Sequence, residues 1–114
     1  MKKRINSRSK GCRGERGWAE YLRENGFKEA RRGRQYSGSP DSPDVVKGIP
    51  GTHAEVKRTE KLNVYDAMNQ AIADSIERDG VIPYVAHRRN DKIWLVILRA
   101  DDFIKIMRQA TFPF

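Results

Sequence analysis

The sequence contains a single cysteine, Cys12, and no apolar run that approaches the length of a membrane span. One cysteine excludes an intrachain disulfide and a zinc site built from several cysteines. The lysine-rich N-terminus is followed by polar residues instead of the hydrophobic region of a signal peptide, so we expect a cytoplasmic protein with no membrane partner. Tandem repeats and the glycine-rich spacing of a nucleotide-binding fingerprint are absent as well.

Basic residues are abundant and unevenly placed. The net charge is +8, and residues 1–34 carry twelve Lys/Arg against four Asp/Glu, whereas residues 35–114 carry eleven of each. The whole excess therefore lies at the N-terminal end. A local basic surface attracts polyanions through phosphate contacts, so we expect DNA as the partner; the alternative is an arm that only confers solubility. The N-terminal run of lysine and arginine predicts a basic arm over residues 1–10, and the length predicts one compact domain over residues 11–114.

Two carboxylates and a lysine form the pattern that carries most chemistry. Asp44 lies eleven residues before Glu55, with turn-forming glycine and proline between them, so we expect a hairpin that brings the two acids together. Side chains alternate along a strand, which places Glu55 and Lys57 on one face. Paired carboxylates suit Mg²⁺ or Mn²⁺, and Lys57 can position a water or neutralise developing charge. The alternative is an ordinary solvated strand face.

This arrangement resembles the PD-(D/E)xK nuclease superfamily, with Asp44 as the first acid and Glu55-Val56-Lys57 as the second acid and lysine. The Gly-x-x-Gly-Glu opening at residues 11–15 and the Ser37-Gly38-Ser39 loop make it similar to the archaeal-type Holliday-junction resolvases. The resemblance implies an α/β fold with a restriction-endonuclease-like core, in which a mixed central β-sheet is flanked by helices. It also implies a homodimeric, Mg²⁺-dependent endonuclease, with Mn²⁺ as a substitute, that cuts branched DNA.

The resemblance also implies roles for individual residues. The metal ligands would be Asp44, Glu55 and the backbone carbonyl of Val56, with Glu15 of the first helix completing the catalytic cluster. Glu15 precedes Trp18, Ala19 and Leu22 at helical spacing and so lies on their buried face; its alternative role is an ion pair with a nearby arginine.

Three further side chains are secondary candidates. Ser39 is the candidate for a functional serine in the loop before Asp44, with Ser37 as the alternative. Gln70 is the candidate for a glutamine near the site, although it projects about 160° from Ile72 on a helical wheel. His53 shares strand parity with Glu55, but a plain turn-edge role is preferred for it over a catalytic one.

The residues expected to contact DNA phosphates are basic and lie in the arm, the first helix, the first strand or directly after Lys57. They are Arg8, Lys10, Arg13, Arg16, Arg31, Arg32, Arg34 and Arg58. Two other functions remain open at this stage. One is an architectural DNA-binding protein that keeps the fold without activity, and the other is a broader structure-specific or nicking nuclease.

Hydrophobic periodicity predicts the remaining elements. We expect a helix over residues 11–25, a strand over 27–34, a helix over 63–79, and strands over 82–87 and 93–98, the last at the centre of the sheet. The helix over 63–79 has an apolar stripe of Leu62, Tyr65, Met68, Ile72 and Ile76. A last helix, capped by Asp101, is expected to pack through Phe103, Ile104 and Met107, and Phe112 and Phe114 either fray or pack on a second subunit.

Overall fold

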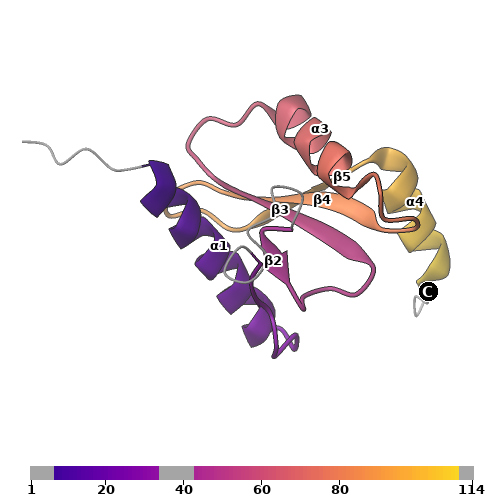
Figure 1. Cartoon of the computed structure of the whole chain (residues 1–114), viewed down its shortest axis with the longest axis horizontal. Coiled ribbons are helices and arrows are strands. Elements are labelled where there is room, and N and C mark those ends of the chain that lie inside the picture. The colour runs from indigo at the N-terminus through magenta and orange to yellow at the C-terminus, as the bar shows by residue number, and fades with distance from the viewer. Residues whose placement is uncertain (1–6, 34–42, 111–114) are drawn as a thin grey trace, which may run out of the picture.

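A five-stranded mixed sheet lies at the centre of the protein. The computed structural model describes residues 7–33 and 43–110, with side chains from Cys12 onward. The elements are helix α1 (Ser7–Glu24), strands β1 (Arg31–Arg32), β2 (Val45–Val46) and β3 (Thr52–Arg58), helix α3 (Val64–Ser75), strands β4 (Ile82–Arg88) and β5 (Leu95–Leu98), and helix α4 (Ala100–Gln109) (Figure 1). This architecture confirms the predicted α/β fold with helices around a mixed sheet. None of the helices in the described ranges is long and apolar enough to cross a membrane.

The strands follow chain order across the sheet, β1-β2-β3-β4-β5. Neighbours are antiparallel except for β3 and β4, which run parallel because α3 connects them as a crossover. The expected hairpin is present, since Val45 of β2 pairs with Ala54 of β3. The strand predicted over 27–34 is much shorter, Arg31–Arg32. The preceding residues are held to the end of α1 instead, where Gly26 has a φ of 102° and the Phe27 N–H donates to the carbonyl of Leu22.

Helix α1 covers one face of the sheet. It begins at Ser7, inside the predicted arm, and buries Trp18, Ala19 and Leu22 in a cluster that includes Ala54 and Val56 of β3. The approach is close at Gly14, where an added Cβ would lie 2.9 Å from the Cβ of Arg58. The small residue in the opening motif therefore lets the helix reach the strand that carries Glu55 and Lys57.

Helix α3 covers the opposite face, as Figure 1 shows. Its buried residues are Ala67, Met68, Ala71 and Ser75, and three of them pack with Val85 of β4. The predicted stripe was therefore wrong at Tyr65 and Ile76, which are 82% and 73% exposed. The helix begins after its cap Asn63 and ends at Ser75, so Ile76 lies beyond it, and the small alanines bring a different face of the helix against the sheet.

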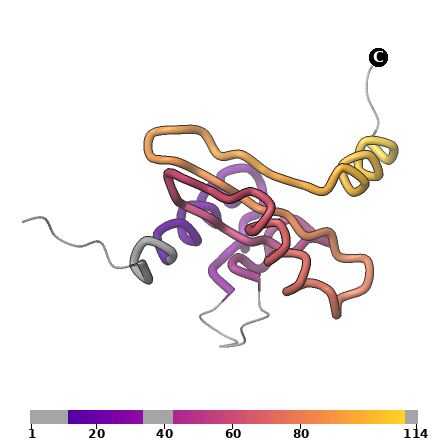
Figure 2. The backbone as a smooth tube through the Cα atoms, turned by 90° about the horizontal axis from the view of Figure 1, so that it is seen from above, coloured from indigo at the N-terminus to yellow at the C-terminus, as the bar shows by residue number. Residues whose placement is uncertain are grey.

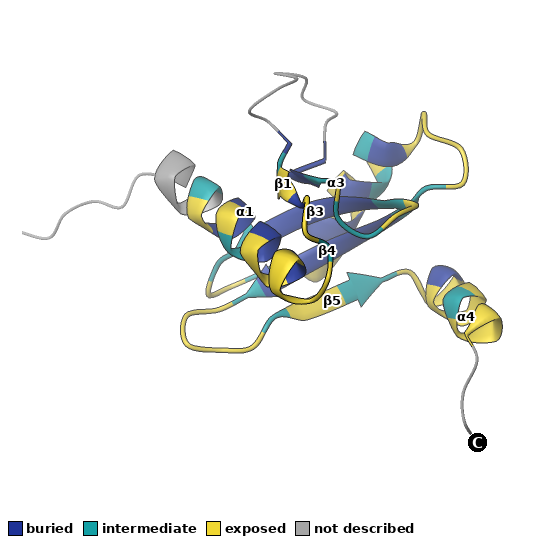
Figure 3. Cartoon of the chain, turned by 90° about the horizontal axis from the view of Figure 1, so that it is seen from below, coloured by how far each residue is buried: buried dark blue, intermediate teal, exposed yellow. Residues whose placement is uncertain are grey.

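Strand β5 is an edge strand, which corrects the prediction that residues 93–98 lie at the sheet centre. Its first two residues, Leu95 and Val96, are about half exposed, and it leads into α4, which extends away from the rest of the molecule (Figures 2 and 3). The expected packing of Phe103, Ile104 and Met107 is also wrong within the single chain, where all three are exposed.

The start of α4 differs from the sequence expectation too. Arg99 occupies the N-cap position in place of Asp101, which lies in the first turn. The Arg99 side chain instead donates to the buried carboxylate of Asp102, with 2.7 Å between Nε and Oδ2. This ion pair lies in the first turn of the helix, directly after β5.

Candidate functional site

Asp44 joins β2 to β3 through its side chain as well as its backbone. Its Oδ2 accepts a hydrogen bond from the backbone N–H of Val56 at 2.8 Å, and its own N–H donates to the carbonyl of Ala54 at 2.9 Å. The side chain is almost fully buried, with 3% of Asp44 exposed. A carboxylate oxygen held by a backbone donor has a fixed position, so Asp44 is pre-organised for binding.

Glu55 lies beside Asp44 and is buried to the same degree. Burial raises the pKa of Glu55 to about 8, and the charge of Asp44 and a hydrogen bond to Asp44 act in the same direction, whereas Lys57 lowers it. Two carboxyl groups in contact in a buried site resist carrying two negative charges. The structure therefore brings together the two acids that the sequence pattern predicted.

Lys57 connects this acid pair to helix α3. Its Nζ lies 3.5 Å from Glu55 Oε1 and donates a hydrogen bond to Gln70 Oε1 at 2.9 Å. Gln70 was doubtful on its helical angle, but α3 crosses the sheet on the face where Lys57 projects. The long lysine side chain reaches the helix, and the amide then holds its ammonium beside Glu55.

His53 and Asp74 extend the same face and were not predicted as a pair. One ligand atom from each of His53, Glu55 and Asp74 lies within 4.8 Å of the others, the only such group found among the described residues. His53 is fully buried, which corrects its expected turn-edge role. Strand parity pointed to His53, and the spacing of four between Gln70 and Asp74 was a usable signal for the helix side.

Glu15 makes the ion pair that sequence analysis gave as its alternative role. Arg32 Nε donates to Glu15 Oε2 at 2.9 Å, and Arg32 Nη2 lies 3.0 Å from the sulfur of Cys12. The hydrogen bond that Arg32 donates to Glu15 is the main reason that the pKa of Arg32 is raised, and the charge of Asp44 contributes in the same direction. Arg32 therefore pairs with Glu15 and also senses the charge of Asp44, and a catalytic role for Glu15 stays a prediction.

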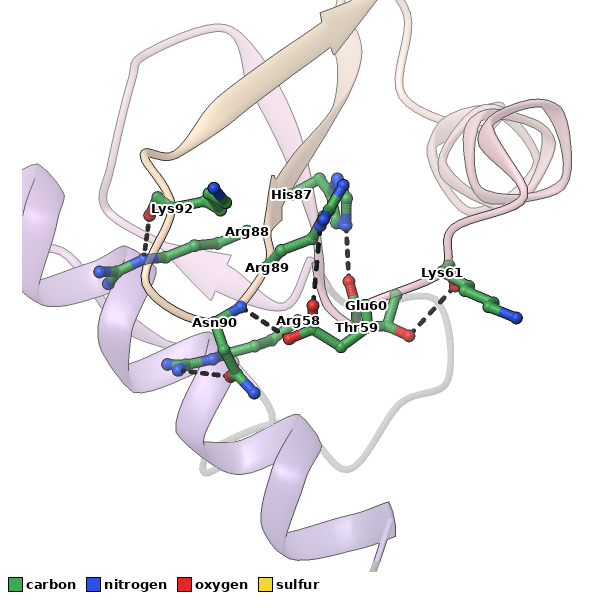
Figure 4. Close-up of polar contacts among 9 residues, drawn as sticks. All are labelled: Arg58, Thr59, Glu60, Lys61, His87, Arg88, Arg89, Asn90 and Lys92. Atoms are coloured by element: carbon green, nitrogen blue, oxygen red, sulfur yellow. Dashed lines mark hydrogen bonds and ion pairs between the residues drawn. The ribbon is translucent and has the colours of Figure 1, made fainter.

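A polar network joins the end of β3 to the turn between β4 and β5 (Figure 4). Arg58 donates to Asn90 Oδ1 at 3.2 Å, while Glu60 accepts from the backbone N–H of Asn90 at 2.8 Å and pairs with Arg89 at 3.6 Å. This network holds Arg58, a predicted phosphate contact, at a corner of the molecule. The other cations of this corner were not predicted as phosphate contacts from the sequence; they are Arg88, Arg89 and Lys92.

Only some of the other predicted phosphate contacts lie among the described side chains. Arg13, Arg16 and Arg31 are exposed, on α1 and β1, so they are accessible to a polyanion. Side chains of Arg8 and Lys10 lie outside the described residues, as do Arg34, both loop serines Ser37 and Ser39, and the tail with Phe112 and Phe114.

Comparison with protein families places this site in a known context. The profile of a family described as archaeal Holliday junction resolvase (Hjc) matches residues 6–111. The chain belongs to the archaeal Holliday junction resolvase family. It is also similar to a solved structure of Archaeoglobus fulgidus Hjc, a Holliday junction resolvase from an archaeal hyperthermophile. The two are 29% identical over 75% of this chain and 73% of that chain, with a TM-score of 0.54. The search of curated proteins gave no significant match.

The residues brought together at the site agree with membership of the resolvase family. Both comparisons support a junction-resolving nuclease that acts on DNA, in recombination and repair, and neither the architectural protein nor the broader nuclease is favoured. The family profile covers α1, the acid pair, Lys57 and Gln70, so the whole predicted site lies within the matched residues.

Proposed function

We propose that this protein is a Mg²⁺-dependent endonuclease that resolves four-way DNA junctions, with Asp44 and Glu55 as the side chains that hold the metal. The observation that carries the proposal is the contact of two buried carboxyl groups beside a lysine. Such a pair is costly in a protein unless a proton or a cation offsets its charge. The family supplies the DNA junction as the substrate.

The donor set fits a hard divalent cation. Asp44 and Glu55 offer carboxylate oxygens, and the carbonyl of Val56 would add a third oxygen from the same strand. Because the pKa of Glu55 is raised to about 8, metal binding displaces a proton from this carboxyl and becomes more favourable as pH rises. When bound, the cation would polarise the scissile phosphodiester and lower the pKa of an attacking water.

Lys57 and Gln70 act as a unit at this site. The Lys57 ammonium stands next to Glu55, where it can stabilise negative charge that develops on a phosphate. Gln70 is a positioning residue, since it contacts Lys57 and holds the ammonium in one orientation. Mn²⁺ shares the preference for oxygen ligands and would substitute for Mg²⁺.

Two basic regions would contact the DNA backbone. The exposed Arg13 and Arg16 on α1 lie on one side, and the corner with Arg58 and Arg89 lies where β3 ends. Arg58 lies three residues after Glu55 on β3, and α1 packs against the same strand, so phosphates near a cut would meet positive charge.

A homodimer would place two such sites on one symmetric junction. Support comes from β5 and α4, where Leu95, Val96, Phe103, Ile104 and Met107 expose apolar side chains that the described part of the chain leaves uncovered. A second copy of the chain is the occupant that a twofold-symmetric substrate requires. We expect Ile104→Glu to shift the sedimentation profile from dimer to monomer, whereas Lys105→Glu on the same helix leaves it unchanged.

The proposal is tested with an end-labelled four-way junction and a linear duplex of the same sequence, in Mg²⁺, Mn²⁺ or EDTA. We expect paired cuts near the branch point that require metal and are reduced at least about 100-fold by Asp44→Asn and by Lys57→Ala. Asp79→Asn, an exposed acid outside the site, is the matched control. Unreduced cleavage by a folded Asp44→Asn protein would overturn the site, and equal cutting of both DNAs would overturn the junction substrate.

A further inference from the structure

His53 is a buried histidine whose ring has no hydrogen-bond partner among the residues that the structure describes. The residue is fully buried, and neither Nδ1 nor Nε2 is paired with a described group. An unsatisfied buried polar group is costly and rare in folded proteins, so it needs an explanation. The imidazole has a lone pair on one nitrogen, which is the ordinary ligand atom for a transition metal.

The neighbours of His53 supply the other ligands. Glu55 follows it on the same face of β3, and that face lies under α3, because the register partner of Glu55 is Val85, which packs against Ala71. Asp74 of α3, the helix that covers this face, is the third member of the group. One nitrogen and two carboxylate oxygens thus lie within 4.8 Å of one another.

Helix α3 places Asp74 here for a simple geometric reason. Gln70 and Asp74 are four residues apart and so project from the same side of the helix. Gln70 contacts Lys57. Asp74, one turn later on the helix, lies near Glu55 and His53, which are two and four positions before Lys57 on β3. Ala71 between them is fully buried, and its small side chain lets the helix approach the sheet closely.

We propose that His53, Glu55 and Asp74 form a site for a divalent transition metal, Zn²⁺ in the first instance, on the α3 side of β3. Zinc accepts a histidine nitrogen and carboxylate oxygens at about 2.0–2.2 Å in a tetrahedral arrangement, so two ligand atoms stand about 3.3–3.6 Å apart. The group, which lies within 4.8 Å, needs to contract by up to about 1.5 Å, which small side-chain rotations of Glu55 and Asp74 can supply. Mg²⁺ is a poor fit because it prefers oxygen ligands alone.

The proposed site is separate from the Asp44 centre except for Glu55, which both would use. Zn²⁺ bound to His53 and Asp74 therefore competes for the Glu55 carboxylate and inhibits Mg²⁺-dependent cleavage. The charged groups that face His53 are Asp74, which favours a cation, and Arg78, which opposes one. The inference stands on this geometry, and only the inhibition rests on the proposed nuclease function.

Direct binding is measured on the full chain stripped with EDTA. The chain has only two histidines, and His87 is already engaged through Nε2 with the carbonyl of Thr59, so ¹⁵N-detected histidine spectra separate the two rings. Adding one equivalent of Zn²⁺ should shift the ring nitrogens of His53 and leave those of His87 in place. A shift of His87 alone, or of neither ring, would overturn the proposal.

Calorimetric titration of Zn²⁺ into variants provides the second arm. Asp74→Asn keeps the shape of the side chain and should weaken Zn²⁺ binding at least about tenfold, as should His53→Asn if it folds. The matched control is Asp66→Asn, an exposed acid on the same helix, which should bind as the unmodified protein does. Equal affinity for the Asp74 and Asp66 variants contradicts the site.

The two proposals fail in different ways. Asp44→Asn removes the proposed Mg²⁺ centre, so it should abolish cleavage but still show the Zn²⁺-induced shift of His53. If instead that shift disappears in Asp44→Asn, Zn²⁺ binds at the Asp44 centre and the separate site is wrong. If the shift is present in every variant that keeps His53 and Asp74 while no DNA is cut, the metal site stands and the nuclease proposal fails.

Discussion

Lys57 of β3 donates a hydrogen bond to Gln70 of α3, with 2.9 Å between Nζ and Oε1. The two residues come from elements on either side of the β3–α3 connection, and their contact places the ammonium 3.5 Å from Glu55. Because the lysine side chain is long and about one third exposed, it has alternative rotamers that this bond restricts. The contact with α3 therefore holds the ammonium of Lys57 beside Glu55.

Replacing Gln70 should slow cleavage without removing it. Gln70→Ala deletes one side-chain hydrogen bond, which is worth about 0.5–1.5 kcal/mol, so we expect a rate roughly 2- to 10-fold lower at saturating DNA. Asn69→Ala, the exposed amide next to it, should cleave at the unmodified rate. A positioning role also predicts that Gln70→Ala has no further effect when Lys57 is already alanine. Additive losses in the double variant would contradict it.

Stability of the metal-free protein should fall with rising pH. The pKa of Glu55 is raised from 4.5 to about 8 when the protein folds, chiefly by burial, so the folded state holds a proton that the unfolded state has lost between these pH values. The stabilising contribution is complete below pH 4.5 and disappears as pH approaches 8. Urea unfolding in EDTA should show a decline of up to about 1.4 kcal/mol per pH unit.

Glu55→Gln is the matched variant for this measurement. A glutamine cannot titrate. The free energy of unfolding should therefore depend less steeply on pH between pH 5 and pH 8, by the contribution of about one proton. Saturating Mg²⁺ should flatten this pH dependence as well, because the cation replaces the proton on Glu55. An unchanged slope in Glu55→Gln would assign the pH dependence to another group.

The role of Glu15 can be separated from its ion pair with Arg32. Glu15→Ala leaves the partly buried Arg32 guanidinium without its partner and should destabilise the fold by about 1–3 kcal/mol, measured by urea unfolding. Glu15→Gln retains a hydrogen-bond acceptor and should fold nearly normally. If Glu15 belongs to the catalytic cluster, this variant cleaves junctions at least about tenfold more slowly, whereas Glu24→Gln, exposed on the same helix, does not. Full activity of Glu15→Gln would leave Glu15 with the ion pair alone.

The hydrogen bond between Trp18 and Tyr84 should be important for stability. Trp18 Nε1 donates to the Tyr84 hydroxyl at 2.8 Å, both residues are about 2% exposed, and burial raises the pKa of Tyr84 to about 12. Tyr84→Phe leaves the indole N–H buried without an acceptor, so the free energy of unfolding should drop by about 1–3 kcal/mol. Tyr65→Phe, an exposed tyrosine, is the control and should change it little. Equal stability of the two variants would mean that water replaces the lost acceptor.

Local patterns in the sequence predicted the strand residues of the site and the acid that precedes them. Asp44, Glu55 and Lys57 were found because a hairpin and strand alternation are short-range rules, which hold wherever the strands pair. Hydrophobic periodicity predicted the two helices that cover the sheet, and the family resemblance implied the mixed sheet; the structure confirms both. Strand β5 was misplaced because its apolar run fits both a buried strand and an exposed interface, which periodicity alone does not distinguish.

The amino-acid sequence by itself determined the acid pair, the lysine, the excess of basic charge and the type of each main element. Only the tertiary structure decided which helix face meets the sheet. Gln70 reaches Lys57, and Asp74 reaches His53, because small alanines let α3 lie close to β3 and β4 in one orientation. That orientation depends on packing between segments far apart in the chain, which maximises buried contact over the whole interface and has no local signature.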